Sequence, residues 1–283
     1  MFENIILIVL YNKEIKDSIT VQNLLKCNVL LNTKVVIWNN GPSSLQFKIS
    51  EKKFNEYGYG FEYVERLNNC SLAEIYNTLI NRNQARRYII LDHDSQVNNL
   101  YLKDINYVSS NEVGMPRIYV NNNLVNPCIN MSPIEKIPNY LGKNIITTIG
   151  SGLVVGSDIA SFVEKKFGNV FDERFVLYGV DTTFCYRINT LNIPNTIKII
   201  NGFEHSLSRL EVESENVETL MFRKKERSCD LGLRIRYYST ERISQLFSFL
   251  LSSFKRLLLR REQQYNFFTV LSCMLLGKHI KKR

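Results

Sequence analysis

The stretch Tyr88–Val97, which reads YIILDHDSQV, decides the fold of this chain. Tyr88 to Leu91 form a continuous apolar run, which is typical of a strand buried in a parallel sheet. The run ends at Asp92-His93-Asp94. Ligands of open α/β sheets bind at the carboxyl ends of strands, and paired carboxylates suit Mg²⁺ or Mn²⁺ shared with substrate phosphates. Asp is also common in solvated turns, so this pair alone leaves both interpretations open.

Strand patterns alternate with helical patterns on both sides of this stretch. Such alternation predicts right-handed crossovers and an α/β fold with a mostly parallel sheet flanked by helices. Ser71 and Glu74 form a capping box before one helix, and we expect Ser157 to cap another that ends at Gly168. The expected strands are 5–11, 35–38, 61–64, 88–92, 113–120, 152–155 and 196–200; the expected helices are 18–25, 69–80, 157–167, one beginning near Asp181 and a long pattern beyond 234; the Asn-rich stretch 121–130 is an expected loop.

The positive charge is concentrated at one end of the 283-residue chain. Leu220 to Arg283 contain 15 Lys and Arg against 4 Asp and Glu, a net charge of +11, whereas the whole chain carries +9. A basic, apolar-rich end indicates an anionic membrane surface or nucleic acid. Because this end is rich in Leu and Phe with helical spacing, we expect a membrane surface and no nucleic acid. No signal peptide or membrane-spanning run is expected.

The chain contains, in this order, the segments IVLYN (8–12), VVIWNNGPS (35–43), YIILDHDS (88–95), FDERFVLYGVDTTFCYR (171–187), His205 and RYYSTER (236–242). Taken together, these segments resemble family 2 glycosyltransferases of the GT-A fold. Among these the chain looks most like bacterial rhamnosyl- and galactofuranosyltransferase-type enzymes. The resemblance implies a catalytic domain over 1–225, with a nucleotide-sugar half of about 1–100 and an acceptor half of about 101–225, and a C-terminal amphipathic helical segment over 226–283.

The resemblance implies a donor site at the ends of the first strands. Tyr11 would stack on the base, although it would also serve as an aromatic at the edge of the core. Asn12, Asn39 and Asn40 would hydrogen-bond the base or ribose. Relatives usually carry Asp where Asn39 stands, so the charge of that position is lost here.

The resemblance also implies a divalent ion, Mn²⁺ or Mg²⁺, bridging the two donor phosphates. Asp94 would bind it, and Asp92 would bind the ion, a metal-bound water or the ribose. His205 is a further ligand in some relatives, and imidazole suits Mn²⁺ better than Mg²⁺. The alternative for His205 is a hydrogen-bonded loop histidine. His93 lies between the two carboxylates, and we expect its side chain to point away from them and to have a structural role.

Asp181 is the expected general base. A direct displacement at the anomeric carbon needs a carboxylate that accepts the proton of the attacking hydroxyl. The alternative is that Asp181 only caps a helix. Asp172 and Glu173 are the next candidates, and Arg187 is expected to pair with one of them. Gly152 would keep backbone clearance on the acceptor side or be an ordinary strand glycine.

These expectations together predict an inverting, metal-dependent hexosyltransferase. It would use a nucleotide-diphosphate sugar of the dTDP-rhamnose or UDP-hexose type. Its acceptor would be a glycan or a polyprenyl-diphosphate-linked glycan of bacterial O-antigen or capsule synthesis, on the cytoplasmic face of the membrane. Three alternatives are a sugar-phosphate nucleotidyltransferase, a non-catalytic protein binding nucleic acid or membrane, and a catalytically dead scaffold. The first would need a Gly-rich basic loop where this chain reads YNKEIKDS, and the last would lack Asp94 or Asp181.

Overall fold

A mixed sheet forms the centre of the computed structural model, which describes residues 1–138, 144–191, 193, 195–206 and 217–282. Its order is β11-β5-β10-β4-β1-β2-β3, with β6 added beside β5. The pairs around β1 are parallel, whereas β10 lies antiparallel between β4 and β5. The strands are β1 (Phe2–Leu10), β2 (Thr33–Asn39), β3 (Gly60–Glu65), β4 (Ala85–Asp92), β5 (Val113–Val120), β6 (Asn123–Asn126), β10 (Val154–Gly156) and β11 (Ile197–Glu204), and a small second sheet has β7 (Cys128–Ile129), β8 (Ser132–Pro133) and β9 (Ile146–Thr147).

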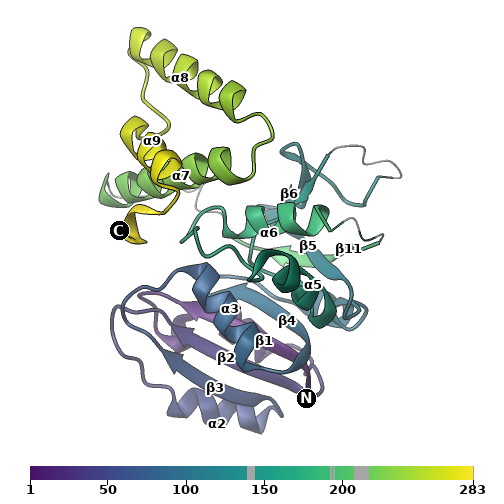
Figure 1. Ribbon diagram of the computed structural model, residues 1–283. Coiled ribbons are helices and arrows are strands. Elements are labelled where there is room, and N and C mark those ends of the chain that lie inside the picture. The colour runs from purple at the N-terminus through teal and green to yellow at the C-terminus, as the bar shows by residue number, and fades with distance from the viewer. Residues whose placement is uncertain (139–143, 192, 194, 207–216, 283) are drawn as a thin grey trace.

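Helices cover both faces of this sheet (Figure 1). Ile5, Leu7 and Val9 of β1 belong to one buried cluster, and Ile6 and Ile8 belong to another on the opposite face. This alternation follows from the two-residue period of a strand, and burial on both faces explains the continuous apolar run. The helices are α1 (Ile19–Leu24), α2 (Lys48–Glu56), α3 (Leu72–Arg82), α4 (Asn99–Ile105), α5 (Ser157–Phe167), α6 (Val180–Asn189), α7 (Val217–Tyr237), α8 (Arg242–Leu258) and α9 (Phe267–Leu276), with short 3₁₀ turns at Ile15–Asp17 and Ile280–Lys282.

The two clusters draw on different helices. One cluster takes apolar side chains from α3, α5 and α6, and the other takes them from α1, α2 and α4. Cys229 and Leu233 of α7 and Cys273 of α9 join the first cluster, so the C-terminal helices are attached to the sheet domain through its core. The predicted α/β fold with a mostly parallel sheet and a helical C-terminal segment is confirmed.

The sequence prediction needs several corrections. Ser71 caps α3 as expected and Gly168 ends α5 in a left-handed conformation, but Gly156 rather than Ser157 holds the N-cap position of α5. The stretch 121–130 is not a simple loop, because both β6 and β7 lie in it. Gly152 precedes β10 in a turn with φ of +85°, where an added Cβ would lie 2.6 Å from a side-chain carbon of Pro116. Helices α2 and α4 were not predicted.

One helix crosses the expected start of the C-terminal segment. The expected boundary between 225 and 226 falls inside α7, which starts at Val217. Helix α9 packs along α7 at Gly232, where an added Cβ would lie 2.4 Å from the carbonyl oxygen of Val270. None of the described helices is both long and apolar enough to cross a membrane. Arg283, one of the cations at the end of the basic segment, lies outside the described residues.

Candidate active site

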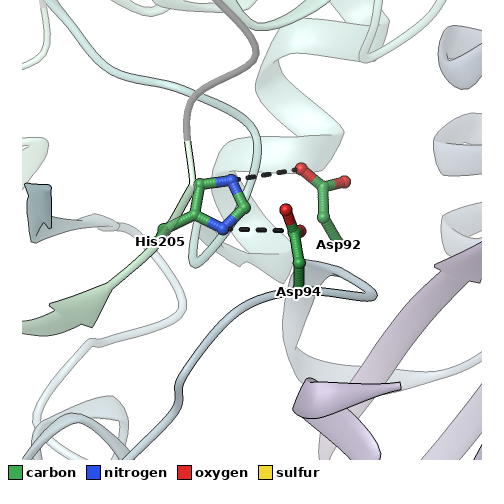
Figure 2. Close-up of side chains that lie close together, drawn as sticks. All are labelled: Asp92, Asp94 and His205. Atoms are coloured by element: carbon green, nitrogen blue, oxygen red, sulfur yellow. Dashed lines mark ion pairs between the residues drawn. The ribbon is translucent and has the colours of Figure 1, made fainter. Parts of the chain in front are cut away.

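Three side chains meet where β4 and β11 end. Asp92 is the last residue of β4, and Asp94 follows two residues later; His205 comes directly after β11. Figure 2 shows the imidazole of His205 facing both carboxylates, with Nε2 3.7 Å from Asp92 Oδ2 and Nδ1 3.5 Å from Asp94 Oδ1. A β-bridge between Ser95 and His205 ties the two segments together. The expected Asp-Asp-His cluster therefore forms from residues that are more than 100 positions apart in sequence.

The turn that carries the two aspartates is anchored to the start of α1. Thr20 donates its hydroxyl to the carbonyl of Asp92 at 2.5 Å and accepts from the amide of Ser95 at 2.8 Å. Ser18 donates to the carbonyl of His93 at 2.9 Å. These bonds satisfy the backbone of a turn that has left the sheet, and they fix the direction of both carboxylates.

The cluster has the donor set of a divalent cation site. One ligand atom from each of the three residues lies within 4.8 Å of the other two. Nδ1 of His205 is buried and has no hydrogen-bond partner among the residues that the structure describes. A buried nitrogen without a partner is costly, and a bound cation would satisfy it. Two carboxylates and one imidazole fit Mn²⁺, and the carboxylates alone fit Mg²⁺.

Electrostatics within the cluster also favour a cation. Burial raises the pKa of Asp92, and the neighbouring charge of Asp94 raises it further, while His205 opposes both effects. Two carboxylates held this close repel each other, so a positive charge between them is stabilising. Ser206 donates to Asp94 Oδ2 at 2.5 Å, which leaves Oδ1 of Asp94 directed at the imidazole.

A cavity of about 1430 Å³ opens beside the cluster. Asp92, Asp94 and His205 line it together with Tyr11, which is 49% exposed, and Asn40. Asn40 is buried. Its side-chain oxygen accepts from the backbone amide of Cys70 at 2.8 Å, and its side-chain nitrogen donates to the carbonyl of Cys70 at 3.1 Å. The cavity exceeds the size of a typical small-molecule site, so it has room for two substrates.

Asn39 and Asn12 lie outside the lining of this cavity, unlike Tyr11 and Asn40. Asn39 is buried and accepts from the amide of Gly41 at 2.9 Å, while its amide nitrogen lies 3.0 Å from Glu65 Oε2. Asn39 therefore organises the turn after β2, and β3 supplies a carboxylate beside it. Asn12 has a positive φ of 49°, and its backbone amide donates to the carbonyl of Gly41, so Asn12 also shapes this loop.

His93 was expected to face away from the two aspartates. The structure places His93 among the residues that line the same cavity. The side-chain alternation of a strand does not continue here, because the chain leaves β4 at Asp92 and turns.

Asp181 lines the same cavity from the first turn of α6. Gly179, with φ of +85°, holds the N-cap position of α6, so Asp181 is not the cap; its Oδ1 accepts instead from the amide of Thr182 at 2.7 Å. Burial raises the pKa of Asp181 to about 6, and the charges of Asp230 and Asp92 also raise it, against the hydrogen bonds from Thr182. A carboxylate with this pKa is ionised at neutral pH and is a stronger base than an ordinary aspartate.

The two fallback candidates have structural roles. Asp172 is buried and pairs with Arg174 at 2.5 Å and with Arg187 at 3.3 Å, which confirms the predicted partner of Arg187. Burial opposes ionisation of Asp172, but hydrogen bonds from Arg174 and Tyr238 and the charge of Arg187 bring its pKa below the usual value. Glu173 accepts from Asn77 at 2.9 Å. Neither acid lines the cavity.

Three cavity residues were missed by the sequence reasoning. Asp230 and Arg234 of α7 form a two-pronged ion pair, with distances of 2.7 and 2.9 Å. Tyr76 of α3 has its pKa raised by burial and by the charges of Asp92 and Asp181, which places its hydroxyl in the field of both carboxylates. The i,i+4 spacing of Asp230 and Arg234 was a visible signal of a helical pair. Their position opposite α6 depends on tertiary packing, which no local pattern reveals.

Comparison with known proteins identifies the fold. No family model and no curated protein sequence matches this chain. Three of the similar solved structures are S. aureus TarS 1–349 in complex with UDP (TM-score 0.51, 14% identity, 86% of this chain and 68% of that one), GalNAc-T7 with UDP, GalNAc and Mn²⁺ (0.53, 12%, 81% and 51%) and the mannosyltransferase PcManGT from Pyrobaculum calidifontis with GDP-Man and Mn²⁺ (0.50, 10%, 82% and 63%). The match to the longer TarS structure covers 45% of that chain. These similarities show that the chain has the GT-A fold.

Proposed function

We propose that this protein is an inverting, metal-dependent glycosyltransferase. The observation that carries the proposal is the Asp92-Asp94-His205 cluster at the ends of β4 and β11, facing one cavity with Asp181. Sugar transfer from a nucleotide-diphosphate donor needs a cation for the leaving diphosphate and a separate base for the acceptor hydroxyl. Of the three similar solved structures, two contain UDP and one contains GDP-Man, and two of them contain Mn²⁺.

Asp92, Asp94 and His205 would hold the cation against the donor diphosphate. The ion supplies positive charge that stabilises the departing diphosphate. Tyr11 would stack on the base from the exposed edge of the cavity, and Asn40 would face the ribose or base. The buried turn around Asn39 would keep these two side chains in place.

Asp181 would accept the proton of the acceptor hydroxyl as that oxygen attacks the anomeric carbon. Its carboxylate reaches the cavity from α6, whereas the proposed cation ligands reach it from β4 and β11. In a direct displacement the attacking hydroxyl and the leaving group take opposite sides of the sugar, so the base and the cation would come from different elements. This arrangement supports direct displacement with inversion. The raised pKa of Asp181, about 6, makes the carboxylate basic enough to assist while leaving it ionised at pH 7.

The finer assignments follow the family resemblance. We propose a donor of the dTDP-rhamnose or UDP-hexose type and a glycan or polyprenyl-diphosphate-linked acceptor, in bacterial O-antigen or capsule synthesis. The cavity volume supports two substrates at once. The net charge of +11 over residues 220–283 supports a position on the cytoplasmic face of an anionic membrane.

The test is thermal unfolding with UDP, dTDP or GDP, each with Mn²⁺, Mg²⁺ or EDTA. A cation held by only three protein ligands needs diphosphate oxygens to complete its coordination, so nucleotide and metal should stabilise the protein cooperatively. We expect one nucleotide to raise the melting temperature with Mn²⁺ or Mg²⁺ and to do so far less with EDTA. Asp94→Ala should remove this difference.

Glu56→Ala is the matched control, since Glu56 is an exposed acid in α2 outside the cavity. It should behave as the parent protein does. Equal stabilisation by nucleotide with EDTA and with Mn²⁺ would refute the metal site.

A further inference from the structure

Helix α8 turns its apolar side chains toward solvent. Ile243, Phe247, Leu251, Phe254 and Leu258 follow one another at intervals of four, four, three and four residues, so they form one stripe along the helix. Their exposed fractions lie between 59% and 86%. A surface helix normally turns such a stripe toward the core, and contiguous exposed apolar side chains mark an interaction site.

The side of α8 nearest α7 carries mainly polar residues, which are themselves exposed. Gln245, Ser248 and Ser252 line a gap between α8 and α7. Phe249 is the buried side chain of α8, and it stacks on Phe267 with ring centroids 5.8 Å apart. This helix is therefore inverted relative to an ordinary surface helix, with its polar side toward α7 and its apolar side outward.

The ends of the stripe are cationic. Residues 242–261 contain five Lys and Arg and no Asp or Glu. Arg242, Lys255, Arg260 and Arg261 are exposed, and the ion pairs of the described chain include none of them. An apolar stripe with unpaired cations at its margins complements a surface that is apolar inside and anionic at its boundary.

We propose that the outward face of α8 docks on an anionic lipid bilayer, lying in its interface without crossing it. A second copy of this chain fits the face less well, because pairing two such helices would bring ten cations together with no acid from either helix. The proposal rests on the proposed function for the idea that the acceptor is carried by that bilayer.

The position of α8 relative to the cavity connects the docking face to the proposed active site. Figure 1 shows α8 at the outer edge of the helical segment, with α7 and α9 on its inner side. Helix α7 contributes Phe222 and Arg223 to the cavity lining, and the C-terminal turn contributes Lys281. The segment that meets the bilayer thus also forms one border of the cavity, where a lipid-linked acceptor would enter.

Vesicle sedimentation of the full chain tests this inference. Two kinds of vesicle are compared. One contains phosphatidylcholine with about 30 mol% of the anionic lipid phosphatidylglycerol, and the other contains phosphatidylcholine alone. We expect binding to the anionic vesicles that weakens with added salt. The double variant Phe247→Ser/Leu251→Ser should bind at least about tenfold more weakly. Lys255→Gln and Arg260→Gln should each weaken binding about fivefold.

The matched control is Ile49→Ser/Leu100→Ser, which removes two apolar side chains that are 74% and 62% exposed on the sheet domain. This variant should bind vesicles as the parent chain does. No vesicle binding by the parent chain, or equal binding by the Phe247/Leu251 variant, would overturn the proposal. A dimer of the parent chain that this variant converts to a monomer would also overturn it and assign the face to a second copy.

Nucleotide-dependent thermal stabilisation of the same variants, measured without vesicles, separates the two proposals. It should be unchanged in every α8 variant, since α8 does not line the large cavity. An α8 variant that loses vesicle binding but keeps nucleotide binding would support the docking face independently of the proposed function. Absent nucleotide binding with intact vesicle binding would refute the proposed function and leave the docking face in place.

Discussion

The two walls of the cavity are built in different ways. On one wall, Asp92, Asp94 and His205 lie at the ends of strands of the central sheet, and the hydroxyl groups of Ser18 and Thr20 donate to the backbone of the turn that carries the aspartates. On the other wall, Asp181 in α6 and Asp230 in α7 come from helices, and their relation depends on how these helices pack. The strand wall gathers ligand atoms, and the helix wall adjusts the pKa of one carboxylate. Under the proposed function, donor binding and proton transfer are therefore assigned to different elements of the fold, and variants should separate them.

Asp181→Asn should produce the largest separation of the two walls. Asparagine has the shape of aspartate but cannot accept the acceptor proton, so sugar transfer should fall by roughly 10² or more. Metal-dependent stabilisation by nucleotide should persist, because the strand wall is intact. The measurements are the transfer rate at saturating donor and the melting temperature with nucleotide and Mn²⁺.

Asp94→Ala is the reciprocal variant and should lose both properties. Transfer by Asp181→Asn at close to the parent rate would remove Asp181 from the reaction. Asp172 and Glu173 would not replace it, since both are held in contacts outside the cavity.

The pH dependence of sugar transfer should follow the ionisation of Asp181 on the helix wall. Asp181 has its pKa raised to about 6, so it is protonated and inactive below that pH and ionised above it. The transfer rate should fall about tenfold for each pH unit below 6 and level off above it. The measurement is the transfer rate at saturating donor and acceptor between about pH 4.5 and 8, roughly two pH units on either side of this pKa. The fall of the rate on the acid side gives the pKa of the titrating base.

The control is donor binding, measured over the same pH range, because it depends on the strand wall and not on Asp181. A limb near the ordinary aspartate pKa of about 4 would mean that Asp181 is not the titrating base.

The strand wall was more predictable than the helix wall for a physical reason. β1 and β4 are buried on both faces, so their sequences are continuous apolar runs, and Asp92 and Asp94 mark the end of one run. The Ser71 cap of α3 is likewise a local signal. His205 could be connected to these residues only through the family resemblance, because nothing local joins positions 94 and 205.

Elements that depend on tertiary contacts were missed. Helix α2 is mostly polar and buries only Phe54, so it has no strong apolar period. β6 lies in an Asn-rich stretch and forms because it pairs with β5. The side chain of Asn39 points into its own turn, where Glu65 of the adjacent strand supplies an acceptor. Neither its direction nor that partner is visible in the sequence around position 39.

Asp230→Asn should give the smallest and most specific effect, a shift of the acid limb to lower pH. Asp230 lies against the start of α6, where a Cβ added at Gly179 would be 2.3 Å from its Oδ1. Its charge is one cause of the raised pKa of Asp181, and burial is the larger cause. Removing the charge should therefore move the limb below pH 6 but not to the ordinary value near 4, since burial remains.

Asparagine at position 230 keeps an oxygen that accepts from Arg234, so the contact between α6 and α7 should persist, and the rate above pH 7 should change little. Glu262→Gln is the control, because Glu262 is 91% exposed and does not line the cavity. The pH profile of that variant should match the parent. An unshifted limb in Asp230→Asn would show that the charge of Asp230 does not reach Asp181. Burial, the charge of Asp92 and the hydrogen bonds from Thr182 would then set the pKa of Asp181.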